Sequence, residues 1–130
     1  MATELALLDL SFTAAADLRT KQYYLVKISA SRSINIGTLG AAFGVLQNKP
    51  NTGEFATVRN RGLSKVIAGG TIAAGDNLTS DSTGRAIKLT PFASSIADAY
   101  YNHIGVAIES AVVGDIFTIV SDGPTPVQTS

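Results

Sequence analysis

The sequence predicts a mainly β domain of short antiparallel strands, with one or two short helices and extended termini. Three observations lead to this fold class. The chain has 130 residues, of which 45% are apolar, which suits one domain with its own core. Its apolar runs are short and are separated by frequent Gly and Pro, a pattern typical of strands joined by turns. Turns in which an acid follows glycine recur at Gly53-Glu54, Gly75-Asp76 and Gly114-Asp115.

Strands are expected where β-branched and aromatic residues cluster or alternate. Residues 23–29 (YYLVKIS) are the clearest example, and Ile34 and Ile36 alternate within residues 33–36. Gly62 divides residues 55–67 into two segments, which form either a hairpin or one kinked strand. The expected strands are residues 10–15, 23–29, 33–36, 42–48, 55–59, 63–67, 77–80, 85–89, 103–109 and 115–121.

Two short helical segments are also expected. Residues 92–101 place Phe92, Ile96 and Tyr100 four residues apart, directly after Pro91, which ends the preceding strand. A serine at position 94 or 95 would cap this helix. A second single turn of helix is expected at Ala14–Arg19.

The chain is expected to divide into a body and two flanks. Residues 1–13 form an N-terminal arm or first strand, and residues 14–121 form the β-rich domain. Residues 122–130 contain Pro124 and Pro126 and have no periodicity, so they are expected to form an extended C-terminal tail.

Two segments of the chain repeat one another. Residues 44–62 and 105–123 align without gaps, and Glu54 and Val58 of the first correspond to Asp115 and Ile119 of the second. Each copy has the pattern of a strand, a turn that needs glycine, an acid and a second strand. The acid is expected to accept backbone N–H bonds across its turn. The repeat has two explanations, a true duplication or similar hairpins under similar constraints. The identical pairs are Gly44/Gly105, Val45/Val106, Gly53/Gly114, Thr57/Thr118 and Gly62/Gly123.

Composition argues against several classes of partner. Ten basic and ten acidic residues give a net charge of zero, and the basic residues are scattered, so nucleic acid is not an expected partner. The absence of cysteine excludes disulfides, thiolate zinc sites and a cysteine nucleophile. The first ten residues lack the features of a signal peptide, and no apolar run is long enough to span a bilayer, so no membrane partner is expected.

No catalytic, cofactor-binding or metal-binding residue is predicted. The one histidine, His103, forms no recognisable catalytic motif with Asp98 or the serines, and it is interpreted as structural. Asp76 and Asp81 lie close enough in sequence to suggest a calcium site, but the alternating acids of an EF-hand loop are missing. Acids that stabilise turns are the better interpretation. The sequence therefore predicts a protein that binds another protein surface and not an enzyme.

An ordered series of short motifs resembles the capsid cement, or head decoration, proteins of tailed phages. The series runs from residue 11 to residue 121 and is interrupted at Phe92–Tyr101. The extended N-terminus, Met1–Leu10, and the proline-bearing tail also depart from the family pattern. The motifs are Ala16-Asp17-Leu18 before Gln22-Tyr23, Gln47-Asn48-Lys49-Pro50, Gly53-Glu54, Ala68-Gly69-Gly70, Gly75-Asp76, Ser80-Asp81 through Gly84-Arg85-Ala86, Ile104-Gly105-Val106-Ala107 and Gly114-Asp115.

The resemblance implies a small β-barrel or sandwich that binds the outside of an assembled phage capsid. The implied partners are the major capsid protein and other copies of the chain, with a homotrimer favoured over a homodimer. Such a protein is made in the host cytoplasm, becomes part of the outer capsid surface, and stabilises capsid contacts against the pressure of packaged DNA without catalysis. Met1–Thr13 or Gly123–Ser130 would be the arms that contact the capsid lattice.

Two other functions stay open. The first is a ligand or carrier β-barrel, because turns of the type AAGDxL also occur in carrier domains that present a modified lysine. Lys49 is the one hairpin lysine that suits this role, although its neighbours do not fit. The second is another phage structural accessory, such as a fibre base or a tail component.

Overall fold

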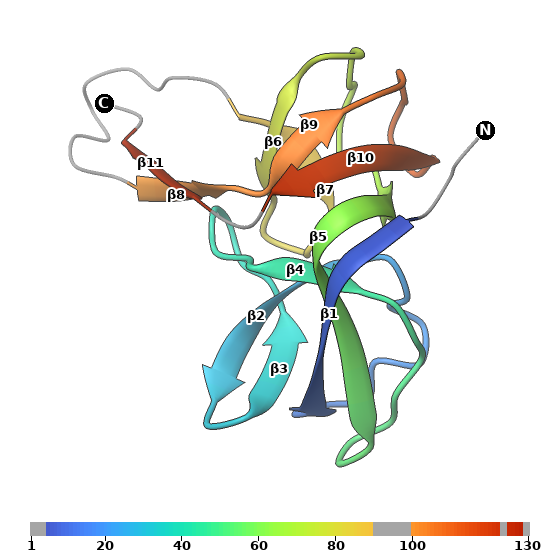
Figure 1. The fold of residues 1–130 in the computed structure, drawn as a ribbon, viewed down its shortest axis with the longest axis vertical. Coiled ribbons are helices and arrows are strands. Elements are labelled where there is room, and N and C mark those ends of the chain that lie inside the picture. The colour runs from blue at the N-terminus through green and yellow to red at the C-terminus, as the bar shows by residue number, and fades with distance from the viewer. Residues whose placement is uncertain (1–4, 90–99, 123–124, 129–130) are drawn as a thin grey trace.

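The computed structural model describes residues 5–89, 100–122 and 125–128 (Figure 1). All regular elements within these residues are strands, and most lie where the sequence predicts them. They are β1 Leu5–Ala14, β2 Leu25–Ala30, β3 Ser33–Ile36, β4 Gly44–Leu46, β5 Phe55–Ile67, β6 Asn77–Ser80, β7 Ala86–Lys88, β8 Tyr100–His103, β9 Gly105–Ala107, β10 Ile116–Asp122 and β11 Thr125–Gln128.

The helical turn expected at Ala14–Arg19 is wrong, because Ala14 ends β1 and the residues after it form a bend and a turn without helix. Its backbone N–H groups donate to carbonyls far away in sequence and not to those of a preceding helical turn. The Ala14 N–H donates to Glu54 and the Leu18 N–H to Pro50, each at 2.9 Å. The other expected helix, residues 92–101, falls mostly on residues 90–99, outside the described residues, and its last two residues begin β8.

Nine strands form one sheet, and part of this sheet closes into a barrel. The order is β1-β3-β2-β4-β5-β10-β9-β6-β7, and an additional β1–β5 pairing closes the first five strands into a barrel. β5 is one continuous strand of 13 residues, with Gly62 at a φ of 116° in its interior, so the kinked-strand alternative is confirmed. Beyond β5, the other four strands curl back until Ala86 of β7 meets Ala68, next to β5, in a parallel bridge.

The molecule consists of two halves with the same backbone pairing. We define the N half as residues 9–61 and the C half as residues 63–122. In Figure 1 the N half lies below and the C half above, with β5 running through both. Equivalent strand pairs have the same register, so the sequence repeat reflects one duplicated hydrogen-bonding framework. The equivalent pairs are Phe12↔Ala56 with Val66↔Phe117, Val45↔Arg59 with Val106↔Val120, Leu25↔Val45 with Asn77↔Val106, Ile28↔Ile34 with Ser80↔Ala86, and Ala14↔Ile34 with Ala68↔Ala86.

The two hydrophobic cores follow the same duplication. Every fully buried residue of the N-half core has a buried counterpart in the C-half core. The C-half cluster also contains Leu25, Ala42 and Val45, which belong to the N half. The two halves are therefore packed into one unit by apolar contact. The matching core residues are Ala14/Ala68, Leu18/Ile72, Val26/Leu78, Ile34/Ala86, Leu46/Ala107, Ala56/Phe117 and Val58/Ile119.

Two strands stand outside the duplicated framework. β8 has no counterpart in the N half, and β11 follows the last strand of the C half. These two strands pair with each other as a separate antiparallel ribbon, seen at the left of Figure 1. Asn102 joins the ribbon to the body: its N–H donates to Gly40 O and its Nδ2 to Ala42 O, both at 2.9 Å.

Candidate interaction surface

The three glycine–acid turns share one geometry. In each turn the acid's N–H donates to the carbonyl three residues earlier, and its carboxylate accepts the N–H of that same residue. Glycine has a φ between 82° and 93° at the third position, as a type II turn requires. The acids thus brace turns, as the sequence predicts. The carboxylate bonds are Asn51 N–H to Glu54 (2.7 Å), Ala73 N–H to Asp76 (2.9 Å) and Val112 N–H to Asp115 (3.1 Å).

A fourth copy of this turn carries a tyrosine in the glycine position. Tyr23 is the N-half counterpart of Gly75 and has a φ of 71°, and the Tyr24 N–H donates to Lys21 O at 3.1 Å. A left-handed backbone is unfavourable for a bulky residue, so the tyrosine strains this turn. The Lys65 ammonium lies 5.6 Å from the centre of the Tyr23 ring. The sequence gives no signal for this turn, because it lacks the glycine.

The residues considered for chemistry are not brought together. His103 ends β8, and its Nε2 lies 3.0 Å from Asn77 Oδ1, while Asp98 is outside the described residues. Asp76 and Asp81 each serve their own turn: Asp81 accepts the N–H groups of Thr83 and Arg85 at 2.9 and 2.8 Å. Across the described ranges, no group of three or more potential ligands gathers at one point.

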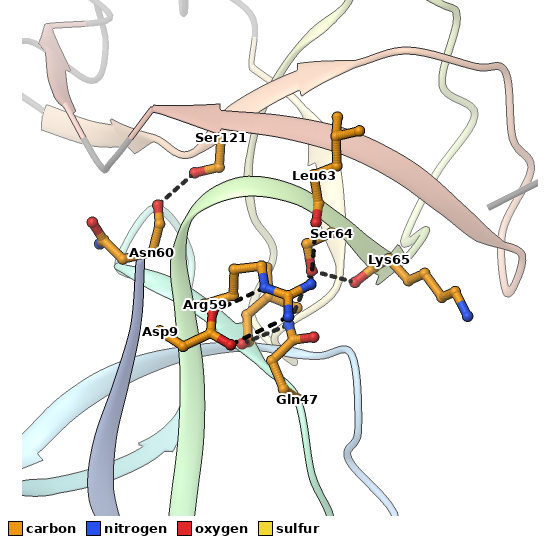
Figure 2. Close-up of polar contacts among 9 residues, drawn as sticks. Asp9, Gln47, Arg59, Asn60, Leu63, Ser64, Lys65 and Ser121 are labelled. Atoms are coloured by element: carbon orange, nitrogen blue, oxygen red, sulfur yellow. Dashed lines mark hydrogen bonds and ion pairs between the residues drawn. The ribbon is translucent and has the colours of Figure 1, made fainter. Parts of the chain in front are cut away.

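A set of polar contacts fixes the junction between the halves (Figure 2). Arg59 forms an ion pair with Asp9 at 2.9 Å and also donates to Leu63 O at 3.2 Å. Gln47 Nε2 donates to Ser64 Oγ at 3.0 Å, which joins the N half to a buried position of the C half. These bonds hold β4 and the two segments of β5 in fixed positions.

The C half exposes aliphatic side chains at five positions where the N half has mostly polar ones. We call Ile108, Val112, Val113, Ile116 and Val120 the aliphatic surface; they are between 41% and 58% exposed. Their N-half counterparts, in the same order, are Gln47, Asn51, Thr52, Phe55 and Arg59. Because the same backbone forms with polar residues at four of these positions, the fold does not require aliphatic side chains there. An exposed apolar patch of this kind is typical of a protein contact.

Two carboxylates have perturbed acidity. Hydrogen bonds from Thr118 lower the pKa of Glu109 below its usual range, and the Thr118 N–H to Glu109 Oε2 distance is 2.8 Å. Asn48 takes the same role in the N half, where it accepts the Thr57 N–H at 3.1 Å. On the surface, hydrogen bonds from Arg19 lower the pKa of Asp17 to about 2.

No helix able to cross a membrane occurs in the part of the chain that the structure describes. A comparison with curated proteins finds no match. Among solved structures, the chain is similar to the head fiber gp8.5 N base in bacteriophage phi29, with a TM-score of 0.62 and 22% identity. The similarity covers 88% of this chain and 93% of that chain, and it shows a shared fold.

A family model described as phage cement protein matches residues 3–121. The match includes both halves, and with them the braced turns and the aliphatic surface. The chain therefore belongs to the phage cement protein family, as a structural component of the phage capsid.

Proposed function

We propose that this chain binds the outside of the assembled phage capsid and stabilises contacts between major capsid protein subunits against internal DNA pressure. Membership of the cement family and the aliphatic surface of the C half support this proposal. The proposed partners are the major capsid protein and further copies of this chain, as a homotrimer, with neither nucleic acid nor a membrane involved. The protein is made in the host cytoplasm and acts without catalysis.

Stabilisation follows from linkage. A protein that binds the assembled shell better than free subunits shifts the equilibrium toward the shell. An oligomer that touches several subunits at once gains avidity, because each later contact is intramolecular. Zero net charge allows many copies to sit close together without accumulating repulsion.

The Val112-Val113 turn is the observation that carries the proposal. Both side chains lie at the tip of an acid-braced turn and are 57% and 58% exposed. The equivalent turn of the N half has the same backbone but presents Asn51 and Thr52. We infer that the two valines make the apolar centre of the capsid contact, within a body formed by residues 14–121 and the first strand, since Leu5–Thr13 belong to β1, which closes the barrel. The tail, residues 122–130, then serves as a flanking arm.

The test transfers the polar turn of the N half to the C half. The double variant Val112→Asn/Val113→Thr keeps a turn that this backbone already forms, so it is expected to fold normally. Its occupancy on capsids, measured by electron cryomicroscopy and by co-sedimentation, is expected to fall at least tenfold. Ile28→Ser is the matched control, because Ile28 is also 57% exposed but lies in the N half. Equal occupancy of the double variant and the wild type would contradict the proposal.

A second candidate is the base of a head fibre, which the shared fold with the phi29 head fiber base favours. The two functions differ in what electron cryomicroscopy of whole particles would reveal. A cement protein gives compact density at the capsid surface, and its removal lowers the resistance of filled capsids to heat or osmotic shock. A fibre base carries a projecting fibre, and its removal leaves that resistance unchanged.

A further inference from the structure

We propose that Phe55 anchors a second capsid contact, so that one chain bridges two neighbouring major capsid protein subunits. The aliphatic surface holds one subunit, and the opposite end of β5 holds the next. The inference rests on the proposed function and deepens it, because it names a second contact site and makes each chain a clamp by itself, independently of contacts between copies.

Phe55 is the most exposed large apolar side chain among the described residues, at 78%. Its C-half counterpart is Ile116, which belongs to the aliphatic surface and is 51% exposed. At the other four equivalent positions the N half has polar residues, so Phe55 is the one apolar residue that it keeps in this set. Exposed aromatic rings of this kind are enriched at the centres of protein contacts.

The backbone around Phe55 is held in place by hydrogen bonds. The Phe55 carbonyl accepts a bond from Asn48 Nδ2 at 2.9 Å. The preceding Glu54 closes a braced turn by accepting the Asn51 N–H at 2.7 Å, and its carbonyl accepts the Ala14 N–H at 2.9 Å. An aromatic side chain on a fixed backbone has only two torsion angles to order on binding, so little conformational entropy is lost.

Charged side chains border the Phe55 end of the molecule. Backbone hydrogen bonds place residues 14–18 against the turn that precedes Phe55. Asp17 and Arg19 form an ion pair at 2.8 Å on this side, with side chains 50% and 60% exposed, and Glu54 is exposed as well. The site that receives Phe55 is therefore expected to be an apolar pocket with a charged border. It differs from the site for the aliphatic surface, so each end of the chain fits its own site on the capsid protein.

The two contacts lie at opposite ends of one strand. β5 begins with Phe55 and ends with Ile67, which pairs with Ile116 of the aliphatic surface. Figure 1 shows β5 running from the lower half into the upper half, and a strand of 13 residues spans at most about 40 Å. A chain that strengthens contacts between subunits has to bind at least two of them. With one contact made, the second becomes intramolecular and gains avidity.

The test compares binding with protection on filled capsids that lack this protein. Co-sedimentation gives the dissociation constant, and DNA release on heating gives the protection. Phe55→Thr, which keeps a strand-forming residue, is expected to weaken binding at least tenfold. At saturating concentration it should still cover the capsids through its aliphatic surface. These covered capsids are expected to release DNA at the temperature of bare capsids, because the bridge is missing.

Leu39→Thr is the matched control. Leu39 is 49% exposed but lies near the junction of the halves, where the Gly40 N–H donates to Ser80 O at 2.9 Å. This variant is expected to bind and protect like the wild type. Because Phe55 contributes little to the core, Phe55→Thr should keep the wild-type midpoint of urea unfolding and, by light scattering, the wild-type molar mass.

The possible failures can be told apart. If folded Phe55→Thr binds and protects capsids as well as the wild type, the inference is wrong and the proposed function stands. If the wild type neither binds nor protects capsids, both are wrong. If Phe55→Thr lowers the molar mass of the isolated chain, Phe55 serves a contact between copies, and the inference is again overturned.

Discussion

The duplicated strand register is tested most directly by two glycines that differ in what surrounds them. A Cβ at Gly105 would lie 2.5 Å from Val120 O and 3.2 Å from Ile119 Cδ1, so β9 and β10 would have to move apart. A Cβ at Gly114 would have no neighbour within 4 Å, but the backbone there has a φ of +89°. Alanine at the two positions therefore destabilises the protein for different reasons.

The expected magnitudes differ by a factor of about three. Gly105→Ala overpacks a strand pair against a backbone carbonyl, which costs about 3 kcal/mol. Gly114→Ala costs about 1–2 kcal/mol of left-handed strain, reduced by about 0.4–1 kcal/mol because the unfolded chain loses freedom. With a urea m-value of about 2 kcal/mol/M, the unfolding midpoint should fall by about 1.5 M for the first variant and about 0.5 M for the second.

Urea unfolding followed by circular dichroism measures both shifts. Gly44→Ala is the matched control for Gly105→Ala, because its Cβ would lie 2.8 Å from Arg59 O in the equivalent strand pair. It is expected to shift the midpoint about as far. If Gly105→Ala proves no more destabilising than Gly114→Ala, β9 does not approach β10 as the equivalence requires.

Three further predictions concern individual contacts. Arg59→Val leaves Asp9 without its ion pair and should lower the free energy of unfolding by about 2 kcal/mol. The double variant Asp9→Leu/Arg59→Val copies the apolar pair of the C half. In urea titrations it should recover most of that loss. Glu109 has a lowered pKa, so its contribution to stability is present above its unfolded pKa and is lost as the pH falls through its folded pKa. Glu109→Gln removes this contribution. The variant should therefore show a flatter decline of the melting temperature below about pH 4.3 than the wild type. Tyr23→Gly relieves the backbone strain of the turn, which stabilises the protein. It also loses the contact with Lys65 and raises the entropy of the unfolded chain, and both effects destabilise the protein. Its free energy of unfolding should therefore stay within about 1 kcal/mol of the wild type, and a larger loss would show that the ring itself holds the turn.

Much of the fold could be predicted because turns and strands are encoded locally. The glycine–acid pairs mark three turns, and the repeat between residues 44–62 and 105–123 falls on two hairpins with one register. The fourth turn was missed because Tyr23 replaces the glycine that would mark it. The helical turn at Ala14–Arg19 was wrong because its N–H groups find partners far away in sequence.

The candidate surface could not be found from the sequence alone. Single aliphatic residues such as Val113 or Ile108 are common on protein surfaces, and their pattern gives no sign of exposure. Their meaning comes from comparison with the equivalent positions of the other half, and that comparison needs the register. The sequence repeat contained this information, but it left open whether the similarity reflected duplication or shared constraints.

β5 gives the molecule a mechanical property as well as a topological one. Its 13 residues run through both halves, and its neighbours β1, β4 and β10 hold it along both edges. A load that pulls the halves apart along this strand acts as shear on many hydrogen bonds at once and not as peeling of one bond at a time. The shared core and the Gln47–Ser64 contact resist the same load, so the chain should yield to force as a single unit. That property would suit the proposed cement function, in which the neighbouring capsid subunits are pushed outward by the packaged DNA.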